Sequence, residues 1–270
     1  MTEKIQQYFD LMRDIEENFI TYIGENSQNY NFINYLDKQK IIENKQKFKS
    51  FLYLLVNLSN NYHRSKDYYS KIDQILTHYQ NAIQKFYQNS EIFHIFQSNK
   101  LILLFLIQQK LITINQGIFD IFNQKKYLQR SYIEYFYPEI ESFIISESVK
   151  NEYKDKIIEL YDNNLDQFDE KRKIGENDSY LCSLIRNDEV IDFITYLEKN
   201  NISPSSLIKP SIYETNHFLL KNNEKVTLIE YSAFFGAQQI FQYLTKQNVE
   251  LTSDIWLYVI HGKNAEIIHF

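Results

Sequence analysis

The sequence is poor in the residues that make turns. It holds five Gly and three Pro in 270 residues, whereas average usage is about 7% and 5%. Sandwiches, barrels and phosphate-binding loops draw their turns from these two residues, so their scarcity argues against such architectures. A collagen-like chain is excluded for the same reason. None of the Gly lies in a G-x-G-x-x-G or Walker-type pattern, so no nucleotide-binding motif is present.

Cysteine and long apolar runs are also scarce. The single cysteine, Cys182, excludes an internal disulfide and fits a reducing compartment. The first residues, MTEKIQQYFDLMRD, lack the apolar core of a secretory signal. The most apolar run, at 101–114, is interrupted by polar residues and is shorter than the roughly 20 residues that span a bilayer. We therefore expect an intracellular, cytoplasmic protein with no membrane span.

The charge distribution argues against a nucleic-acid partner. The net charge is −6, and residues 176–270 carry 7 basic and 12 acidic residues, a net of −5. Phosphate binding needs a positive field, which comes from clustered Lys and Arg. No such cluster is visible, so the sequence predicts that nucleic acid is not a partner.

What the sequence does contain, up to about residue 165, is a sustained helical pattern. Ile5, Phe9, Met12, Ile15 and Phe19 follow the i, i+3/i+4 spacing of a core-facing helix. The most apolar run predicts a buried helix, and Pro138 suits the first turn of a new helix. No strand alternation persists. We expect an all-α protein with six to eight helices in this region.

One long polar stretch, at 161–177, is the candidate domain boundary. The chain changes character beyond it. We therefore expect a helical N-terminal region at 1–175 and a different architecture at 176–270.

The second region contains an internal repeat. The segment 227–244, TLIEYSAFFGAQQIFQYL, reads as two short helices folded at Gly236. Small side chains at Ser232 and Ala233 let two helix backbones approach, and Gly236 supplies the positive φ of a tight turn. Weaker copies flank it. Ile267 takes the place of Ile240 after 27 residues, and Val190 takes it 50 residues upstream, with Cys182 and Ser183 at the small positions.

This segment resembles the ankyrin repeat, whose pattern is T-P-L-H-x-A-A-x-x-G-x-x-x-I-V-x-x-L-L. The matching residues are Thr227, Ile229, Ala233, Gly236, Ile240 and Leu244. The whole chain is similar to a divergent ankyrin family that is expanded in some protists and has a helical N-terminal region. The resemblance implies a helix-turn-helix solenoid with degenerate repeats at about 179–202, 227–250 and 254–270, separated by a long loop or hairpin at 203–226.

Two departures from the ankyrin pattern fall in the last copy. Val259 and Ile260 are bulky where the pattern is small, and Lys263 replaces the turn Gly. The chain also stops at Phe270, inside the second helix of a repeat, whereas solenoids need a polar terminal cap. We therefore expect a fragment or a shortened family member.

No catalytic, cofactor-binding or metal-binding residues are predicted. Cys182 lacks a nucleophile signature and occupies a position that predicts a small buried side chain. The six His residues show no H-E-x-x-H motif and have no Cys partner for zinc. The sequence therefore predicts that no cofactor or metal is bound.

The insertion at 203–226 carries the candidate binding residues, since recognition commonly lies on loops of a rigid scaffold. We assign partner binding to Tyr213, Glu214, Asn216 and His217. The alternative is that apolar neighbours such as Ile212, Phe218 and Leu219 simply pack this loop onto the repeats.

Ankyrin arrays act by binding other proteins, so the resemblance implies a protein-interaction module without enzymatic activity and with a protein partner of unknown identity. Two alternatives remain. One is an unrecognised enzyme with its site in the N-terminal region. The other is a self-associating helical scaffold.

Overall fold

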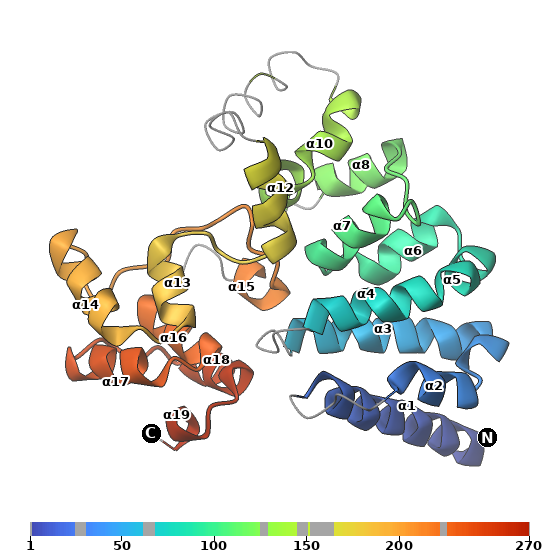
Figure 1. Cartoon of the computed structure of the whole chain (residues 1–270), viewed down its shortest axis with the longest axis horizontal. Helices are drawn as coiled ribbons and strands as arrows, with labels where there is room; N and C mark the ends of the chain where they lie inside the picture. Colours follow the sequence, from blue (N-terminus) through green and yellow to red (C-terminus); the bar gives the residue numbers. More distant parts are fainter. Residues whose placement is uncertain are drawn as a thin grey trace. The chain divides into compact units, whose positions relative to one another are not determined.

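The regular structure of this chain is helical. The computed structural model describes residues 2–24, 31–61, 68–124, 129–144, 151, 165–221 and 226–269. Within these ranges no strand occurs, and the only bridge joins Leu207 to Thr227. The expected all-α class is confirmed (Figure 1). The chain divides into two compact units, residues 1–124 with 138–143 and residues 125–137 with 144–270.

The first unit consists of helices that follow one another along the chain. They are α1 (Thr2–Ile23), α2 (Phe32–Lys38), η1 (Ile41–Glu43), α3 (Lys45–Asn61), α4 (Tyr68–His78), α5 (Gln80–Phe86), α6 (Asn89–Phe96), α7 (Lys100–Gln108), α8 (Gln116–Gln124) and η2 (Glu141–Phe143), with most of α10 (Tyr137–Ile140). Together with α9 (Gln129–Tyr135), the described residues up to 144 hold ten α-helices, so six to eight was too few. The sequence pattern alone does not separate α4 from α5, which are divided only at Tyr79.

Periodic apolar residues make the core of the first unit. In α3, Phe48, Leu52 and Leu55 lie on the buried side, and α7 is buried on nearly every side, as its run of apolar residues predicts. Pro138 lies in the first turn of α10, as expected. Among the described residues no helix is long and apolar enough to cross a membrane.

The predicted stripe of α1 is only half correct. Ile15 and Phe19 are buried, but Ile5 and Phe9 are exposed. The spacing of apolar residues indicates the face of a helix, but it does not indicate how far a neighbouring helix extends along that face.

The second unit contains α9, α12 (Leu165–Ile174), α13 (Tyr180–Arg186), α14 (Val190–Lys199), α15 (His217–Lys221), α16 (Leu228–Phe235), α17 (Gln238–Lys246), α18 (Ile255–Gly262) and α19 (Ala265–Ile268). Residues 161–164 of the candidate boundary lie outside the described residues. Buried Arg172 joins α12 to α9, because its Nη1 donates to the Tyr135 carbonyl at 3.0 Å and the Tyr135 hydroxyl donates to the Arg172 carbonyl at 2.9 Å.

Three helix pairs of the second unit share one register. The first helices α13, α16 and α18 have Ser179, Thr227 and Asp254 at their N-caps. Nine residues after each N-cap comes a left-handed residue, respectively Asp188 (φ 55°), Gly236 (φ 64°) and Lys263 (φ 48°). The second helices α14, α17 and α19 begin within two residues of that turn.

This register corrects one sequence expectation. The left-handed residues are separated by 236 − 188 = 48 and 263 − 236 = 27 residues. The 27-residue interval agrees with the sequence, but the 50-residue interval assigned through Val190 is wrong by two. Leu184 and Ile185, rather than Cys182 and Ser183, therefore correspond to Ser232 and Ala233. The small side chains of Cys182 and Ser183 therefore do not mark the repeat register. The helix N-caps and the left-handed turns do.

Consecutive pairs pack on one another. Helix α13 packs on α16 and α16 on α18, while α14 packs on α17 and α17 on α19 (Figure 1). The turns are also bonded. The Asp188 carboxylate accepts hydrogen bonds from the amides of Gln239 and Ile240, both at 3.0 Å, and Asn264 Nδ2 donates to the Gly236 carbonyl at 2.9 Å.

The left-handed turn at Lys263 gives a first prediction. A left-handed conformation costs a side chain about 1–2 kcal/mol, and Gly avoids this cost. Lys263→Gly should therefore raise the free energy of unfolding by about 1 kcal/mol, whereas Gly236→Val should lower it by more than that. Denaturant unfolding measures both changes.

The control is Lys49→Gly inside α3, where Gly should cost about 1 kcal/mol. If Lys263→Gly destabilises the protein as much as Lys49→Gly does, the third pair does not share the left-handed turn of the others.

Candidate functional site

Hydrogen bonds join the start of the insertion at 203–226 to its end and to the segment before α13. Near α16, the Ile208 amide donates to the Val226 carbonyl at 2.7 Å, and the Leu228 amide donates to the Ser206 carbonyl at 3.1 Å. Near α13, Asn177 Nδ2 donates to the Lys209 carbonyl at 2.8 Å. The start of the insertion therefore has a defined position on the helix pairs.

The structure buries most of the residues predicted to bind a partner. Tyr213, Glu214 and Asn216 are only 1%, 4% and 7% exposed, and His217 is half-buried. The premise that these side chains form an exposed surface is wrong for the first three. Their role in partner binding stays a prediction.

These residues can be buried because polar groups within the loop satisfy one another's hydrogen bonds. Asn216 Oδ1 accepts from the Phe218 amide at 3.0 Å at the start of α15, and the Asn216 amide donates to Glu214 Oε1 at 2.8 Å. The ring of Tyr213 lies against Phe168, with centroids 5.5 Å apart. The packing alternative raised for this loop thus describes these three residues best.

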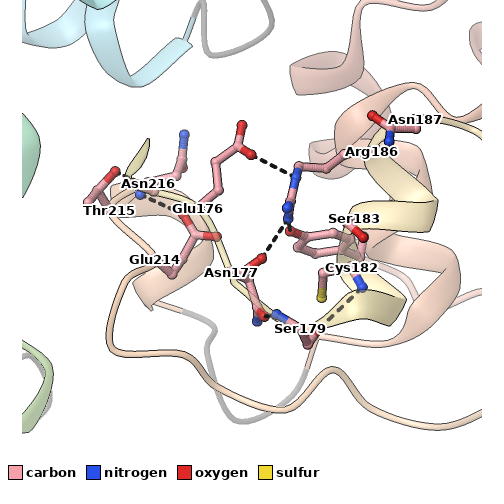
Figure 2. Close-up of polar contacts among 12 residues, drawn as sticks. Glu176, Asn177, Ser179, Cys182, Ser183, Arg186, Asn187, Glu214, Thr215 and Asn216 are labelled. Carbon is pink, nitrogen blue, oxygen red and sulfur yellow. Dashed lines mark hydrogen bonds and ion pairs between the residues drawn. The ribbon is translucent and has the colours of Figure 1, made fainter. Parts of the chain in front are cut away.

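Beside this loop lies a cluster centred on Arg186 of α13 (Figure 2). Its Nε lies 2.8 Å from Glu176 Oε2, and its Nη1 donates to the Asn177 carbonyl at 2.8 Å and to the Tyr231 hydroxyl at 3.0 Å. One guanidinium thereby joins the segment before α13 to helix α16. Arginine presents its donors in a rigid planar fork that suits such a junction.

Cys182 lies in the same cluster and is buried, as predicted. The Ser179 hydroxyl accepts a hydrogen bond from the Cys182 amide at 3.2 Å and caps α13. Burial raises the pKa of the Cys182 thiol to about 11, and burial likewise raises the pKa of Tyr231. Because the thiolate is the reactive form, this environment suppresses nucleophilic chemistry at Cys182.

The raised pKa of Cys182 gives a second prediction. The pKa of Cys182 is higher in the folded state than in the unfolded state. The buried neutral thiol therefore makes its full contribution to the free energy of unfolding below the unfolded-state pKa, and this contribution is lost as the pH rises towards about 11. At neutral pH, alkylation of Cys182 should be much slower in the native protein than in denaturant. The parent should also lose more stability between pH 9 and pH 11 than Cys182→Ala. Equal alkylation rates in the two states would refute the burial.

Glu230 is a structural residue that the sequence analysis did not assign. Its Oε2 accepts from the Thr227 amide at 2.8 Å, and the Glu230 amide donates to Thr227 Oγ1 at 3.2 Å, which together form a capping box. The Thr252 hydroxyl donates to Glu230 Oε1. The signal was present, since T-L-I-E at 227–230 has the spacing of this motif.

The Thr227–Glu230–Thr252 bonds connect two loops that each expose a leucine. Leu207 bridges to Thr227 and Leu251 precedes Thr252, and both leucines are about half exposed (51% and 44%). Glu250 and Asp254, near Leu251, are exposed carboxylates. We call Leu207 and Leu251 the loop leucines. Unlike Tyr213, Glu214 and Asn216, they are exposed.

Among the described residues, no group of three or more His, Cys, Asp or Glu side chains lies close enough together to hold a metal ion. His261 instead lies against Phe218, with ring centroids 4.3 Å apart, and burial lowers its pKa. Comparison with protein-family models, curated proteins and solved structures found no match.

Proposed function

We propose that residues 176–270 form a short array of degenerate ankyrin-like repeats that binds another protein and has no enzymatic activity. The observation that carries this proposal is the shared register of three consecutive helix pairs, with left-handed turns at Asp188, Gly236 and Lys263. In such arrays each pair buries its apolar face on its neighbours and leaves the loops available for recognition.

The loop leucines are the proposed contact points. Loops that a rigid framework positions commonly carry recognition, and Leu207 and Leu251 are the exposed large apolar side chains on these two loops. The neighbouring carboxylates of Glu250 and Asp254 favour a partner that presents apolar residues within a basic surface. An intracellular, cytoplasmic location belongs to the same proposal.

Site-specific cross-linking in the native cell tests this function. A photo-cross-linking amino acid at position 207 or 251 should capture the same protein, whereas the same amino acid at the exposed control position Ile191 on α14 should not. Leu251→Asp should abolish capture from position 207 without changing the melting temperature. Absence of adducts from both loop positions, or identical adducts from all three, would refute binding at the loop leucines.

A further inference from the structure

The last helix pair has an apolar face that nothing covers among the described residues. Trp256, Leu257 and Ile260 of α18 are 57%, 50% and 65% exposed. At 100° per residue they lie on one side of the helix, opposite the buried residues Ile255 and Val259. We call Trp256, Leu257 and Ile260 the end face.

The equivalent faces of the two earlier pairs are covered. Counting back from the left-handed turns, the end face corresponds to Ile229, Glu230 and Ala233 of α16, all of which are buried where α18 packs on α16. On α13 the corresponding residues are Leu181, Cys182 and Ile185. Cys182 and Ile185 belong to the core that continues into α16, and the partly buried Leu181 packs against that core. The end face is thus the third copy of this helix surface. The first copy, on α13, is covered by α16, and the second, on α16, is covered by α18.

The end face differs from the other two in shape. Ala233 lets the backbone of α18 come so close that a Cβ on Gly262 would lie 2.0 Å from the Ala233 carbonyl oxygen. Ile260 occupies the position of Ala233, and its side chain keeps another helix backbone farther away. A further pair could not approach α18 as closely as α18 approaches α16, and would have to pack as α16 packs on α13, where Ile185 holds this position. A facing helix must interdigitate its side chains with Trp256, Leu257 and Ile260.

We propose that the occupant is a second copy of this chain, with the two α18 helices antiparallel across a two-fold axis. Exposed Asp254 lies at the N-terminal end of α18, and exposed Lys263 lies at its C-terminal end. An antiparallel pair therefore places each Lys263 beside Asp254 of the other copy and opposes the two helix dipoles. The same apolar patch from each copy forms the centre of the interface. This inference does not depend on partner binding by the loop leucines.

Trp256 is the only tryptophan of the sequence, so its fluorescence reports on the end face alone. In a dilution series of the full chain, sedimentation should show a monomer–dimer equilibrium. The emission of Trp256 should shift to shorter wavelength over the same concentration range as the dimer forms. Ile260→Lys should weaken the dimer at least about tenfold, because it places a charge at the centre of an apolar interface. Ile191→Lys, on the exposed side of α14, is the matched control and should change nothing.

A charge exchange tests the antiparallel arrangement. Asp254→Lys and Lys263→Glu should each weaken the dimer, and the double variant should restore it, while circular dichroism shows that every variant is folded. A chain that stays monomeric at all concentrations, or a dimer that Ile260→Lys leaves unchanged, would overturn the proposal. If the double variant loses as much dimer affinity as the two single changes added together, the antiparallel pairing would be overturned. A dimer without cross-links from the loop leucines would refute the proposed function and leave this inference standing.

Discussion

Gly262→Ala should destabilise the second unit by about 3 kcal/mol or more, an unusually large effect for one added methyl group. A Cβ at this position would lie 2.0 Å from the Ala233 carbonyl oxygen and 3.3 Å from the Gly236 amide nitrogen. Both are backbone atoms of the neighbouring pair, so neither moves away without displacing α16 or its turn. Thermal and denaturant unfolding measure the loss.

The matched control is Gly117→Ala in α8. The nearest atom to a Cβ there is the side-chain Oδ1 of Asn115 at 3.5 Å, which is an ordinary contact. Because Ala is a better helix former than Gly, this control should stabilise the protein by up to about 1 kcal/mol. Ala233→Leu probes the same contact from α16 and should cost about 1–3 kcal/mol. If Gly262→Ala and Gly117→Ala had the same effect, α18 would not approach α16 at Gly262.

Arg186→Ala should be the second most damaging change and should lower the free energy of unfolding by about 3 kcal/mol. It removes the ion pair with Glu176 and leaves the Tyr231 hydroxyl and the Asn177 carbonyl without their guanidinium donor. Because Tyr231 and Asn177 are both buried, water does not readily replace the lost donor. Unfolding monitored by circular dichroism gives the size of the loss.

Arg13→Ala on α1 provides the comparison. Arg13 pairs with Asp10 at 3.0 Å, but both side chains are well exposed, and exposed pairs contribute about 0–1 kcal/mol. Arg186→Lys should recover only part of the stability, since one ammonium group does not reproduce the planar fork of donors. A cost for Arg186→Ala as small as that for Arg13→Ala would show that the cluster does not join α13 to α16.

The sequence predicts the features that depend on local physics. Helical spacing indicates the all-α class. The apolar run at 101–114 predicts a buried helix, but α7 ends at Gln108, so only the first part of the run is helical. Gly236 marks a left-handed turn because Gly favours positive φ. The equivalent turn at Lys263 can be predicted only from its position in the repeat, because Lys does not favour the left-handed conformation.

The site was harder to predict because burial in loops depends on tertiary contacts. Tyr213, Glu214 and Asn216 have the composition of an exposed recognition loop, yet their hydrogen bonds and ring contacts lie within the unit. The close approach of Gly262 to Ala233 is likewise invisible in either helix alone. The shift of two residues in the first repeat interval has a similar origin, since small side chains are a weaker guide to register than helix caps.

Amide hydrogen exchange at Gln239 and Ile240 tests most directly whether consecutive helix pairs stack in this register. These two amides at the start of α17 donate to the carboxylate of Asp188, which belongs to the turn of the preceding pair. In Asp188→Ala both amides should lose protection while the amides inside α8 keep theirs. If both amides exchange equally in the parent and the variant, the first pair does not rest on the second, and the stacked register is contradicted.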